Sequence, residues 1–475
     1  MFKIICFLIT GITLTVNANL TLPDLDTVLK HGLYVDKTMI IREVMVGHEK
    51  KMFTAPPLFG KTFNLEIIKR FFEITVDKNG VRKKQSETEN YKLFSSHGLN
   101  IYTQDRTFFD KHFGMYPVLY LDMNYISFES HEEFLYGLRV LIWLAFDEHK
   151  YLKDSVVLSD QQKSYFMKFH NKTEIIQQSP LDLARSVKML SGLLYGHFNK
   201  KCILLIDEYD GPIKKIILLS QDHIQLAMEF YAFFSNFTIK HNPFVDRALM
   251  TGCISQRPPS KVDENNVFHF PFLEKHAFTK LFGFTAKEVK TLLKKQNLLN
   301  EYKNVENWYD GYSLMNEFSI YNPFSIINFI ALKTADMYWA KEAMIKNLEF
   351  ILRHKAINDK VDGILLSKMI SLKLCGRVWE KEIVQLWNIV SLTDPGTSDL
   401  TEDEINLFVQ FMLDLGYFYV ILKIDDTVFP EVPNLEVRKL VTKHLRTAAL
   451  MMGYQETQAA QEKVQQNFKK AGAII

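Results

Sequence analysis

A short segment of this chain has the residue types that bind phosphate groups in many proteins. Gly60, Lys61 and Thr62 end the segment 55–62 (APPLFGKT), which fits the phosphate-loop pattern except at its first position, where Ala55 replaces glycine. In such loops the backbone N–H groups and the N-terminus of the following helix surround the phosphates. We expect Gly60 to permit close approach, Lys61 to place its charge on the β- and γ-phosphates, and Thr62 to bind Mg²⁺ through its hydroxyl.

A second segment, 202–210 (CILLIDEYD), is an apolar run that ends in two adjacent carboxylates. Asp207 would hold Mg²⁺ directly or through water, and Glu208 would polarise an attacking water. Each segment alone has a plainer interpretation, because a Gly-Lys-Thr triplet occurs by chance and many buried strands of α/β proteins end in solvated acids. Together and in this order, the two segments predict a site for ATP and Mg²⁺.

The elements around these segments are those that such a site needs. A short strand at 52–54 enters the loop, and a helix with apolar residues at helical spacing follows at 63–73. Further strands are predicted at 116–123 and 247–252, and a long helical region at 132–194 precedes the acidic strand. Strands separated by helices predict an α/β fold, a P-loop NTPase core with a mostly parallel sheet covered on both faces.

After about residue 270 the pattern becomes helical, and it predicts a helical lid domain. The expected helices have apolar residues at helical spacing and cover residues 286–295, 323–333, 340–354 and 364–371. The last part combines a helix, a hairpin and a second helix, which predicts a small winged-helix-like module. Its expected elements are a helix at 402–415, strands at 417–423 and 428–429, and a helix at 434–445. The expected organisation is 1–18 signal peptide, 19–270 core, 271–400 lid, and 401–475 C-terminal module with a polar tail.

Composition restricts the class of protein. The 475 residues are 47% hydrophobic and 24% charged, which is ordinary for a globular chain of more than one domain. A formal net charge of +2 gives no sign of a polyanion-binding surface, so nucleic-acid binding is not expected. Cys202, Cys253 and Cys375 are too few for a disulfide framework or a zinc site, and we expect them to pack in the core.

The N-terminus has the pattern of a secretory signal. A positive start at 1–3 precedes the apolar segment 4–16, and Val16-Asn17-Ala18 resembles a cleavage site. The alternative is an uncleaved anchor, or a misassigned first exon in front of an intracellular protein. No later segment is long and apolar enough to span a bilayer. Glycosylation acceptors at Asn19, Asn171 and Asn236 are compatible with a secreted glycoprotein.

Many short motifs in one order resemble those of the AAA-ATPase-like family, P-loop proteins that often carry a PD-(D/E)XK nuclease-like domain at the C-terminus. The resemblance runs from about residue 25 to about residue 445. Its landmarks are 34–38 (YVDKT), 59–62 (FGKT), 116–118 (YPV), 205–210 (LIDEYD), 250–252 (MTG), 282–285 (FGFT), 308–312 (WYDGY), 321–325 (YNPFS), 338–339 (YW) and 433–437 (PNLEV). The family implies a nucleotide-binding core, with Thr251 at a sensor position near the γ-phosphate.

The chain departs from the family in two respects. The family's loop usually reads Arg-Pro-Arg-Arg-Phe-Gly-Lys-Ser, so three arginines are missing here. Loss of each charge-assisted contact would weaken nucleotide binding by roughly 1.5–3 kcal/mol. Arg257 is a candidate replacement charge for the nucleotide, or else an ordinary loop arginine before Pro258. The nuclease-like domain is also expected to be missing, so DNA cleavage is not expected.

Two functions of different class follow. The first is an ATP-binding protein, a slow Mg²⁺-dependent ATPase that acts through nucleotide-dependent domain movement. The second is a secreted interaction protein on a degenerate scaffold that no longer hydrolyses ATP. A nucleic-acid-remodelling ATPase using the C-terminal module rests on fold analogy alone. The sequence leaves open whether the chain is an enzyme, which protein it binds, and whether a neighbouring subunit supplies an arginine finger.

Overall fold

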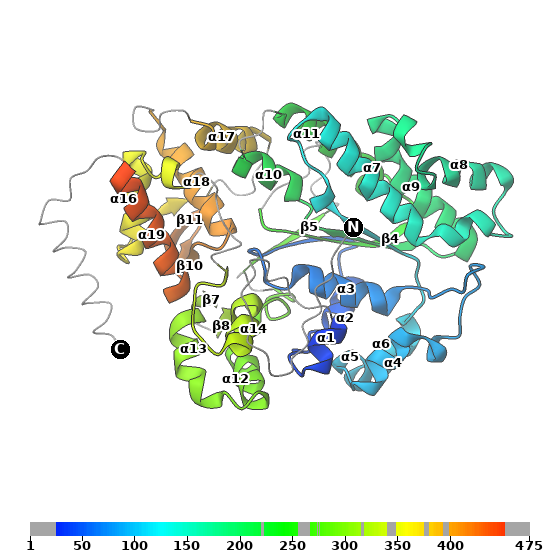
Figure 1. The fold of residues 1–475 in the computed structure, drawn as a ribbon, viewed down its shortest axis with the longest axis horizontal. Helices are drawn as coiled ribbons and strands as arrows, with labels where there is room; N and C mark the ends of the chain where they lie inside the picture. Colours follow the sequence, from blue (N-terminus) through cyan, green and yellow to red (C-terminus); the bar gives the residue numbers. More distant parts are fainter. Residues whose placement is uncertain are drawn as a thin grey trace, which may run out of the picture.

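The computed structural model describes residues 25–219, 223–254, 267–272, 274, 276–314, 318–339, 348–374, 380–392 and 399–451. The N-terminal signal, Asn19, Arg257, Cys375 and the polar tail lie outside these residues. A parallel sheet with helices on both faces occupies one side of the molecule, and the elements after residue 284 lie beside it (Figure 1).

The central sheet has five strands in the order β2-β3-β4-β1-β5, and all four neighbouring pairs are parallel. The strands are β1 Lys50–Thr54, β2 Val118–Asp122, β3 Cys202–Asp207, β4 Val245–Gly252 and β5 Phe268–Pro271. This confirms the predicted α/β fold with a mostly parallel sheet. The sequence pattern missed β5, a four-residue edge strand whose burial is uneven and therefore gives no clear run of apolar residues.

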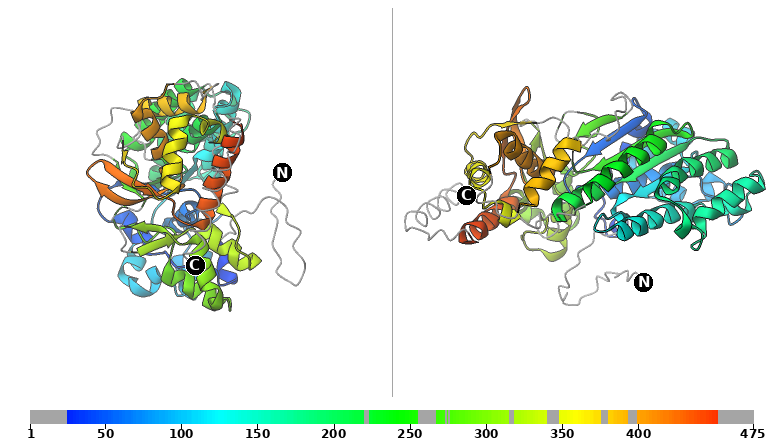
Figure 2. Two further views of the ribbon diagram at one scale, coloured as in Figure 1. Left: turned by 90° about the vertical axis from the view of Figure 1, so that its left-hand side faces the viewer. Right: turned by 90° about the horizontal axis from the view of Figure 1, so that it is seen from above.

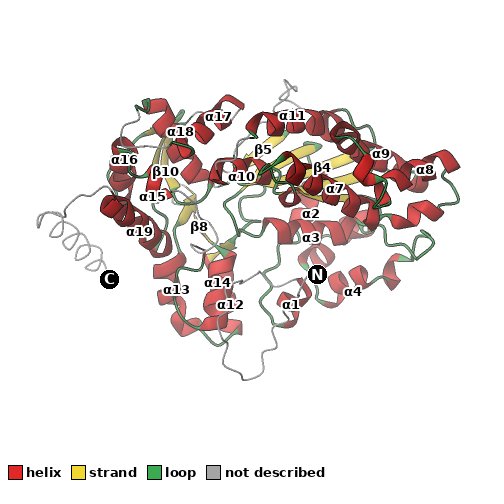
Figure 3. Cartoon of the chain, turned by 45° about the horizontal axis from the view of Figure 1, so that its top comes forward, coloured by secondary structure: helices red, strands yellow, loops and turns green. Residues whose placement is uncertain are grey.

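Alternate residues of the strands build two separate cores, one on each face of the sheet. On β3, Leu204 and Ile206 join the core beneath the helices α7 (His131–Glu148) and α9 (Pro180–Phe198). Ile203 and Leu205 join the core beneath the helices α2 (Ile40–Met45) and α3 (Lys61–Phe72). Because successive side chains of a strand point to opposite faces, a run that is apolar at every position must be covered on both faces. Figure 3 shows the strands enclosed between these helical layers.

The helices of the first half follow the predicted pattern, with more divisions than expected. The region 132–194 is three helices, because polar and short 3₁₀ segments interrupt it. The α-helices are α1 Leu25–Lys30, α2 Ile40–Met45, α3 Lys61–Phe72, α4 Glu89–Ser96, α5 Asn100–Gln104, α6 Arg106–His112, α7 His131–Glu148, α8 Asp160–His170, α9 Pro180–Phe198, α10 Gly211–Leu219 and α11 Ile224–Phe234. A π-helical turn, η5 (Ser235–Lys240), follows α11.

The part of the chain after residue 271 is mainly helical, but it also contains a small antiparallel sheet that the sequence pattern missed. This sheet has the order β6-β8-β7, and its strands are only two to four residues long. Its elements and their neighbours are β6 Phe284–Thr285, α12 Ala286–Lys295, α13 Tyr302–Tyr309, β7 Tyr312–Leu314, β8 Phe318–Tyr321, α14 Pro323–Leu332, α15 Leu348–Ile351, α16 Lys355–Leu365, β9 Leu372–Lys373 and α17 Glu380–Val390.

The prediction of a helix at 364–371 is wrong. The helix here, α16, begins at Lys355 and ends at Leu365. Ser367 then adopts a left-handed conformation with φ +54°, and the N–H of Lys368 donates to the carbonyl of Gly363. Such a turn satisfies the free carbonyls of a helix end and stops the helix. Of the helix expected at 340–354, only the described part can be compared, and it contains α15.

The C-terminal part has the predicted helix, hairpin and helix. These are α18 Glu402–Asp414, the antiparallel strands β10 Tyr419–Ile424 and β11 Thr427–Glu431, and α19 Leu435–Met451. The short strand β9 adds to β11 and completes a three-stranded sheet. Buried residues of these elements, among them Phe411 and Val441, belong to the same core as the residues of the sheet that lie beneath α7 and α9. Two further views show the C-terminal helices packed beside the sheet (Figure 2).

Among the described residues, no helix has the length and apolar character needed to cross a membrane.

Candidate phosphate-binding site

The loop between β1 and α3 positions the first group of predicted residues. β1 ends at Thr54, α3 begins at Lys61, and the N–H of Ala55 donates to the carbonyl of Gly252 on the neighbouring strand (2.9 Å). Gly60 has φ +85°, and no atom outside its chain neighbours lies within 4 Å of the position that a Cβ would take there. The left-handed conformation favours glycine, and the open space beside it is what a phosphate group approaching the backbone needs.

Lys61 turns back over its own loop. Its Nζ donates to the carbonyls of Ala55 and Pro56, both at 3.0 Å, and lies 3.4 Å from Oε1 of Glu208. The side chain is buried. Burial by itself would lower the pKa of Lys61, but the acidic groups of Cys253 and Glu208 beside it raise the pKa above its ordinary value. The loop lysine is therefore a charged group directed at the centre of the loop.

The strand order brings the second group of predicted residues to the same edge. β1 and β3 both flank β4, so the carboxyl ends of the three strands meet. Thr251 of β4 donates to Oδ1 of Asp207 at the end of β3 (2.7 Å), and Tyr120 of β2 donates to Oδ2 (3.2 Å). The side chain of Thr62, an exposed residue, also hydrogen-bonds to Asp207, and burial followed by the charge of Glu208 raises the pKa of this carboxyl.

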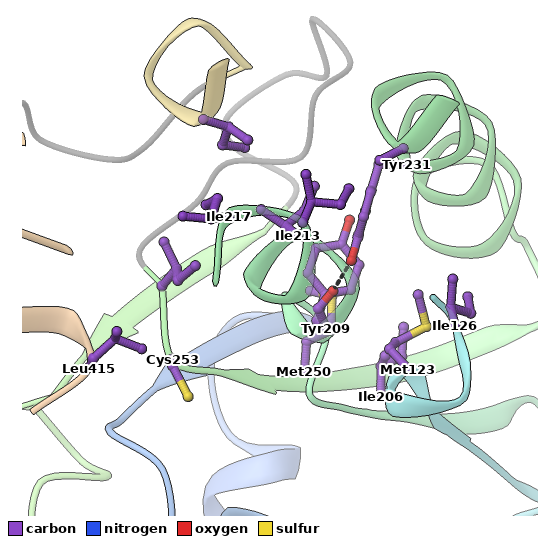
Figure 4. Close-up of a cluster of buried hydrophobic side chains, with 14 of the residues drawn as sticks. Met123, Ile126, Ile206, Tyr209, Ile213, Ile217, Tyr231, Met250, Cys253 and Leu415 are labelled. Carbon is purple, nitrogen blue, oxygen red and sulfur yellow. Dashed lines mark hydrogen bonds between the residues drawn. The ribbon is translucent and has the colours of Figure 1, made fainter. Parts of the chain in front are cut away.

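The turn after β3 separates two neighbouring side chains. Glu208 has φ +45°, which places its carboxylate beside Lys61, while Tyr209 enters the apolar core. The hydroxyl of Tyr231 on α11 donates to the carbonyl of Tyr209 (2.6 Å), and Figure 4 shows this bond among the buried residues around Ile213. A left-handed non-glycine residue is strained, and such strain persists only where the surroundings determine the conformation. Here the buried tyrosines stabilise the turn that directs the carboxylate of Glu208 toward Lys61.

Three residues of the site were missed by the sequence reasoning. Asp210 accepts from the N–H groups of Cys253 (2.7 Å) and Ile254 (2.5 Å), and thereby ties the end of β4 to the turn after β3. Its Oδ1 is buried and has no hydrogen-bond partner among the described residues. Cys253 places its sulfur beside the loop lysine (3.4 Å). Asp210 and Cys253 could have been noticed, because each lies within three residues of a predicted site residue.

Lys214 is the third missed residue and lies on the first turn of α10. Its Nζ donates to Oε2 of Glu208 at 2.6 Å. Burial by itself would raise the pKa of Glu208, but Lys214 and Lys61 lower this pKa to about 2. Glu208 is thus an anion held between two ammonium groups. No sequence pattern pointed to Lys214, because its distance from Glu208 depends on the turn between them.

Elements from the second half of the chain contact the outer side of the phosphate loop. The carbonyl of Pro57 accepts from Nε1 of Trp339 (3.2 Å) and from Nδ2 of Asn322 (3.4 Å). The N–H of Gly283 donates to the carbonyl of Phe59 (3.1 Å). Each of these three donors belongs to a motif that the family resemblance singled out. They lie far from the loop in sequence, and the tertiary fold makes them part of its wall.

The Trp-Tyr-Asp-Gly-Tyr motif packs against the same loop. The ring of Tyr312 meets that of Phe59 edge to face at 5.1 Å, and its hydroxyl donates to the carbonyl of Gly416 (2.7 Å). Gly311 has φ +141°, and a Cβ there would lie 1.5 Å from the carbonyl oxygen of Pro433. The motif is therefore a buried connection between the loop and the C-terminal part.

A mostly apolar pocket lies beside Gly60. Its walls come from the segment before α2, the start of α3, and the segments around β6 and α14. Its lining includes Val28, Leu33, Tyr34, Val35, Lys37, Phe59, Gly60, Phe63, Asn64, Leu281, Gly283, Phe284, Pro323 and Ile327. The hydroxyl of Tyr34 is buried and has no hydrogen-bond partner among the described residues. An apolar pocket with a free polar group is suited to a planar ligand with a few hydrogen-bonding atoms.

The structure thus assembles every predicted site residue that it describes: Gly60, Lys61, Thr62, Asp207, Glu208 and Thr251. A phosphate loop between β1 and α3, with acidic residues at the end of β3 beside it, defines a P-loop ATPase scaffold. The family model described as a predicted AAA-ATPase matches residues 26–257. Over these residues the chain is similar to the AAA-ATPase-like family.

Searches of other known proteins gave remote similarities. The ORC2 protein of Aeropyrum pernix, solved as ADPNP and ADP complexes, is 12% identical; the alignment covers 92% of this chain and 98% of that one, with a TM-score of 0.35. Cdc6p of Pyrobaculum aerophilum is 10% identical over 91% of this chain and 96% of that one, with a TM-score of 0.25. No curated protein matches the chain.

Proposed function

We propose that the chain binds ATP with Mg²⁺ and hydrolyses it slowly. The observation that supports this most is the meeting of Lys61, Thr62 and Asp207 at one edge of the sheet. Lys61 would contact the β- and γ-phosphates, and the loop N–H groups and the N-terminus of α3 would surround them. A bound Mg²⁺ would neutralise charge on the phosphates, with Thr62 and Asp207 as the residues that hold it.

The residues present fit these ligands. The position beside Gly60 is open, and Thr62, an exposed residue, hydrogen-bonds to the carboxylate of Asp207. Oxygen ligands of this kind are those that Mg²⁺ prefers. Thr251 holds Asp207 in place, and Glu208 would orient the attacking water once the lysines leave it. The apolar pocket beside Gly60 would take the base of the nucleotide.

The test is a calorimetric titration of ATP with Mg²⁺ into the purified chain, with Lys61→Ala as the control variant. Binding that Lys61→Ala abolishes would support a working phosphate loop despite Ala55, and measurement of phosphate release would follow. No binding up to millimolar ATP would refute the proposal. Arg257 belongs to the same proposal as a further cation, and Arg257→Ala in the same titration tests it.

We propose movement of the second half of the chain as the response to the nucleotide. The lid (271–400) and the C-terminal module (401–475) are the expected moving parts. The proposed movement is supported by the hydrogen bonds that Gly283, Asn322 and Trp339 donate to the backbone of the phosphate loop. When the loop shifts to surround the phosphates, these three residues must either move with it or break their hydrogen bonds to it. Hydrogen exchange of residues 280–340 with and without ATP tests this, since unchanged protection would contradict it.

The alternative function is an interaction protein that keeps the scaffold without hydrolysis. One observation favours it: two lysines already neutralise Glu208, so this carboxylate is not free to act on water. ATP binding without Mg²⁺-dependent phosphate release would support this alternative. Steady release that Glu208→Gln abolishes would exclude it.

Export from the cell is proposed on the N-terminal sequence alone. Of the two described glycosylation acceptors, Asn171 lies in a turn after α8, whereas Asn236 lies in η5 with Thr238 buried two residues later. Only Asn171 is placed for modification of the folded chain. Expression in secreting cells, followed by N-terminal sequencing of protein from the medium, tests the signal and its cleavage after Ala18.

A further inference from the structure

A second lysine, Lys214, lies in the site beside the same carboxylate as the loop lysine. Nζ of Lys214 is 2.6 Å from Oε2 of Glu208, and Nζ of Lys61 is 3.4 Å from Oε1 of the same carboxylate. Both ammonium groups also contact one sulfur, that of Cys253, at 3.5 Å and 3.4 Å. The two positive charges therefore converge on one small region, although one comes from α3 and the other from α10.

Glu208 is the shared anionic partner of the two lysines. The side chain of Lys214 is 17% exposed and that of Glu208 is 13% exposed, so the pair is shielded from most of the solvent. Two like charges are costly to hold together in such surroundings unless anions lie between them. A triphosphate brings anionic oxygens in greater number than one carboxylate can offer.

We propose that Lys214 is a second phosphate-binding cation, supplied by α10 to the terminal phosphate of a bound nucleoside triphosphate. The inference rests on the proposed nucleotide binding and deepens it. Lys214 and Lys61 hold Glu208 between them. When a triphosphate enters, the two ammonium groups move to its oxygens and release the carboxylate.

The phosphate loop offers a single positive side chain of its own. Lys61 is the only cation among residues 55–62 (APPLFGKT). Lys214 on α10 adds a second positive charge to the site. Because Lys214 lies beside Glu208 at the end of β3, it faces the position of the last phosphate and not that of the base.

The matched control is the neighbouring residue on the same helix. Lys215 carries the same charge, but its Nζ donates to the carbonyls of Asn124 and Ile126 and does not contact Glu208. Lys214→Met and Lys215→Met therefore change the net charge equally. Only the first removes a cation from the site.

The experiment measures Kd for ATP, ADP and AMP in the full chain by calorimetry. Lys214→Met should weaken ATP binding by about tenfold or more, as expected for the loss of one charge-assisted contact, and AMP binding by much less. Lys214→Arg should restore most of the ATP affinity. Lys215→Met should leave the ratio of ATP to AMP affinity unchanged. Thermal unfolding of each variant identifies a loss of folding, and Lys214→Gln replaces the Met variant if that variant does not fold.

The outcomes separate this inference from the proposed function. If the unaltered chain binds ATP, Lys61→Ala abolishes binding, and Lys214→Met binds ATP within twofold of normal, the inference is overturned and the phosphate loop stands. An equal loss of ATP and AMP affinity in Lys214→Met would also overturn it, since this is the result of a purely structural role. If the unaltered chain binds no ATP, both proposals fail.

Discussion

The indole nitrogen of Trp339 donates a hydrogen bond to the carbonyl oxygen of Pro57 across 282 residues of sequence, at a distance of 3.2 Å. The backbone N–H of the same tryptophan donates to Oε1 of Glu436 on α19 (2.7 Å). Trp339 therefore connects the phosphate loop on one side to the last helix on the other. The loop and the C-terminal part are thus joined through one buried residue.

Trp339→Phe removes the hydrogen bond to Pro57 and keeps most of the apolar contact. A net hydrogen bond contributes about 1 kcal/mol, so we expect ATP binding to weaken about fivefold, with a smaller loss of stability. Calorimetric Kd values for the variant and for Trp308→Phe measure this. Trp308 lies on α13 and makes a cation–π contact with Lys439, so it controls for the loss of an indole elsewhere. Equal affinities in both variants would contradict the role of Trp339.

Glu208→Gln tests the water-activating carboxylate. The amide keeps the shape of the side chain but cannot act as a base, so ATP binding should persist while phosphate release falls to background. Removal of the anion between two lysines should also strengthen ATP binding, because the lysines are freed for phosphate. Paired Kd and phosphate-release measurements check both expectations. Turnover at the unaltered rate would show that Glu208 has no part in hydrolysis.

Glu436 makes the stability of the fold dependent on pH. Burial raises its pKa from 4.5 to about 7, against hydrogen bonds from Ser325 and Trp339 that lower it. The folded state therefore binds this proton more tightly than the unfolded state does. The free energy of unfolding should fall as pH rises from about 4.5 to about 7, by up to about 3 kcal/mol from this group, and should level off above the folded-state pKa.

Urea unfolding at pH 5.5, 6.5 and 8 measures this dependence, with Glu436→Gln as the comparison. The amide does not titrate and resembles the protonated carboxyl, so the variant should lose this part of the pH dependence, be closest to the unaltered protein in acid solution, and be the more stable of the two at pH 8. Identical slopes of stability against pH for the two proteins would show that Glu436 is not the group responsible.

Gly311→Ala should destabilise the fold severely. The added Cβ would lie 1.5 Å from the carbonyl oxygen of Pro433, and backbone is on the other side of this contact, so no side chain can move away. We expect a loss of several kcal/mol, or failure to fold. Gly196→Ala within α9 is the control, because the atom nearest to its new Cβ belongs to the flexible side chain of Leu158 and alanine favours the helix. Thermal unfolding compares the two.

Tyr34→Phe tests whether the hydroxyl of Tyr34 contacts the nucleotide in the apolar pocket. The hydroxyl of Tyr34 is buried without a hydrogen-bond partner among the described residues, and a buried unpaired hydroxyl costs free energy. Its removal should raise the melting temperature slightly and weaken ATP binding several-fold, if the hydroxyl contacts the nucleotide. A stabilised variant with unchanged ATP affinity would show that the pocket does not take the base.

The sequence alone determined the core of this protein and most of its candidate site. The apolar run of β3 required a sheet covered on both faces, and the order of strand, loop and helix around Lys61 predicted a phosphate loop. Asp207 was predicted because it ends a buried apolar strand, and Thr251 was predicted by the resemblance to the AAA-ATPase-like family. In each case the signal is local, since strand and helix patterns depend on neighbouring residues.

Only the tertiary structure decided what surrounds these residues. The contact between Lys214 and Glu208 depends on the left-handed conformation of Glu208. The contacts of Trp339, Asn322 and Gly283 with the loop join segments that are hundreds of residues apart in sequence. The short strands β5 to β9 form because they pair with partners, not because their few residues favour a strand. Long-range packing of this kind leaves no periodic signal in the sequence, so it becomes visible only when the chain is folded.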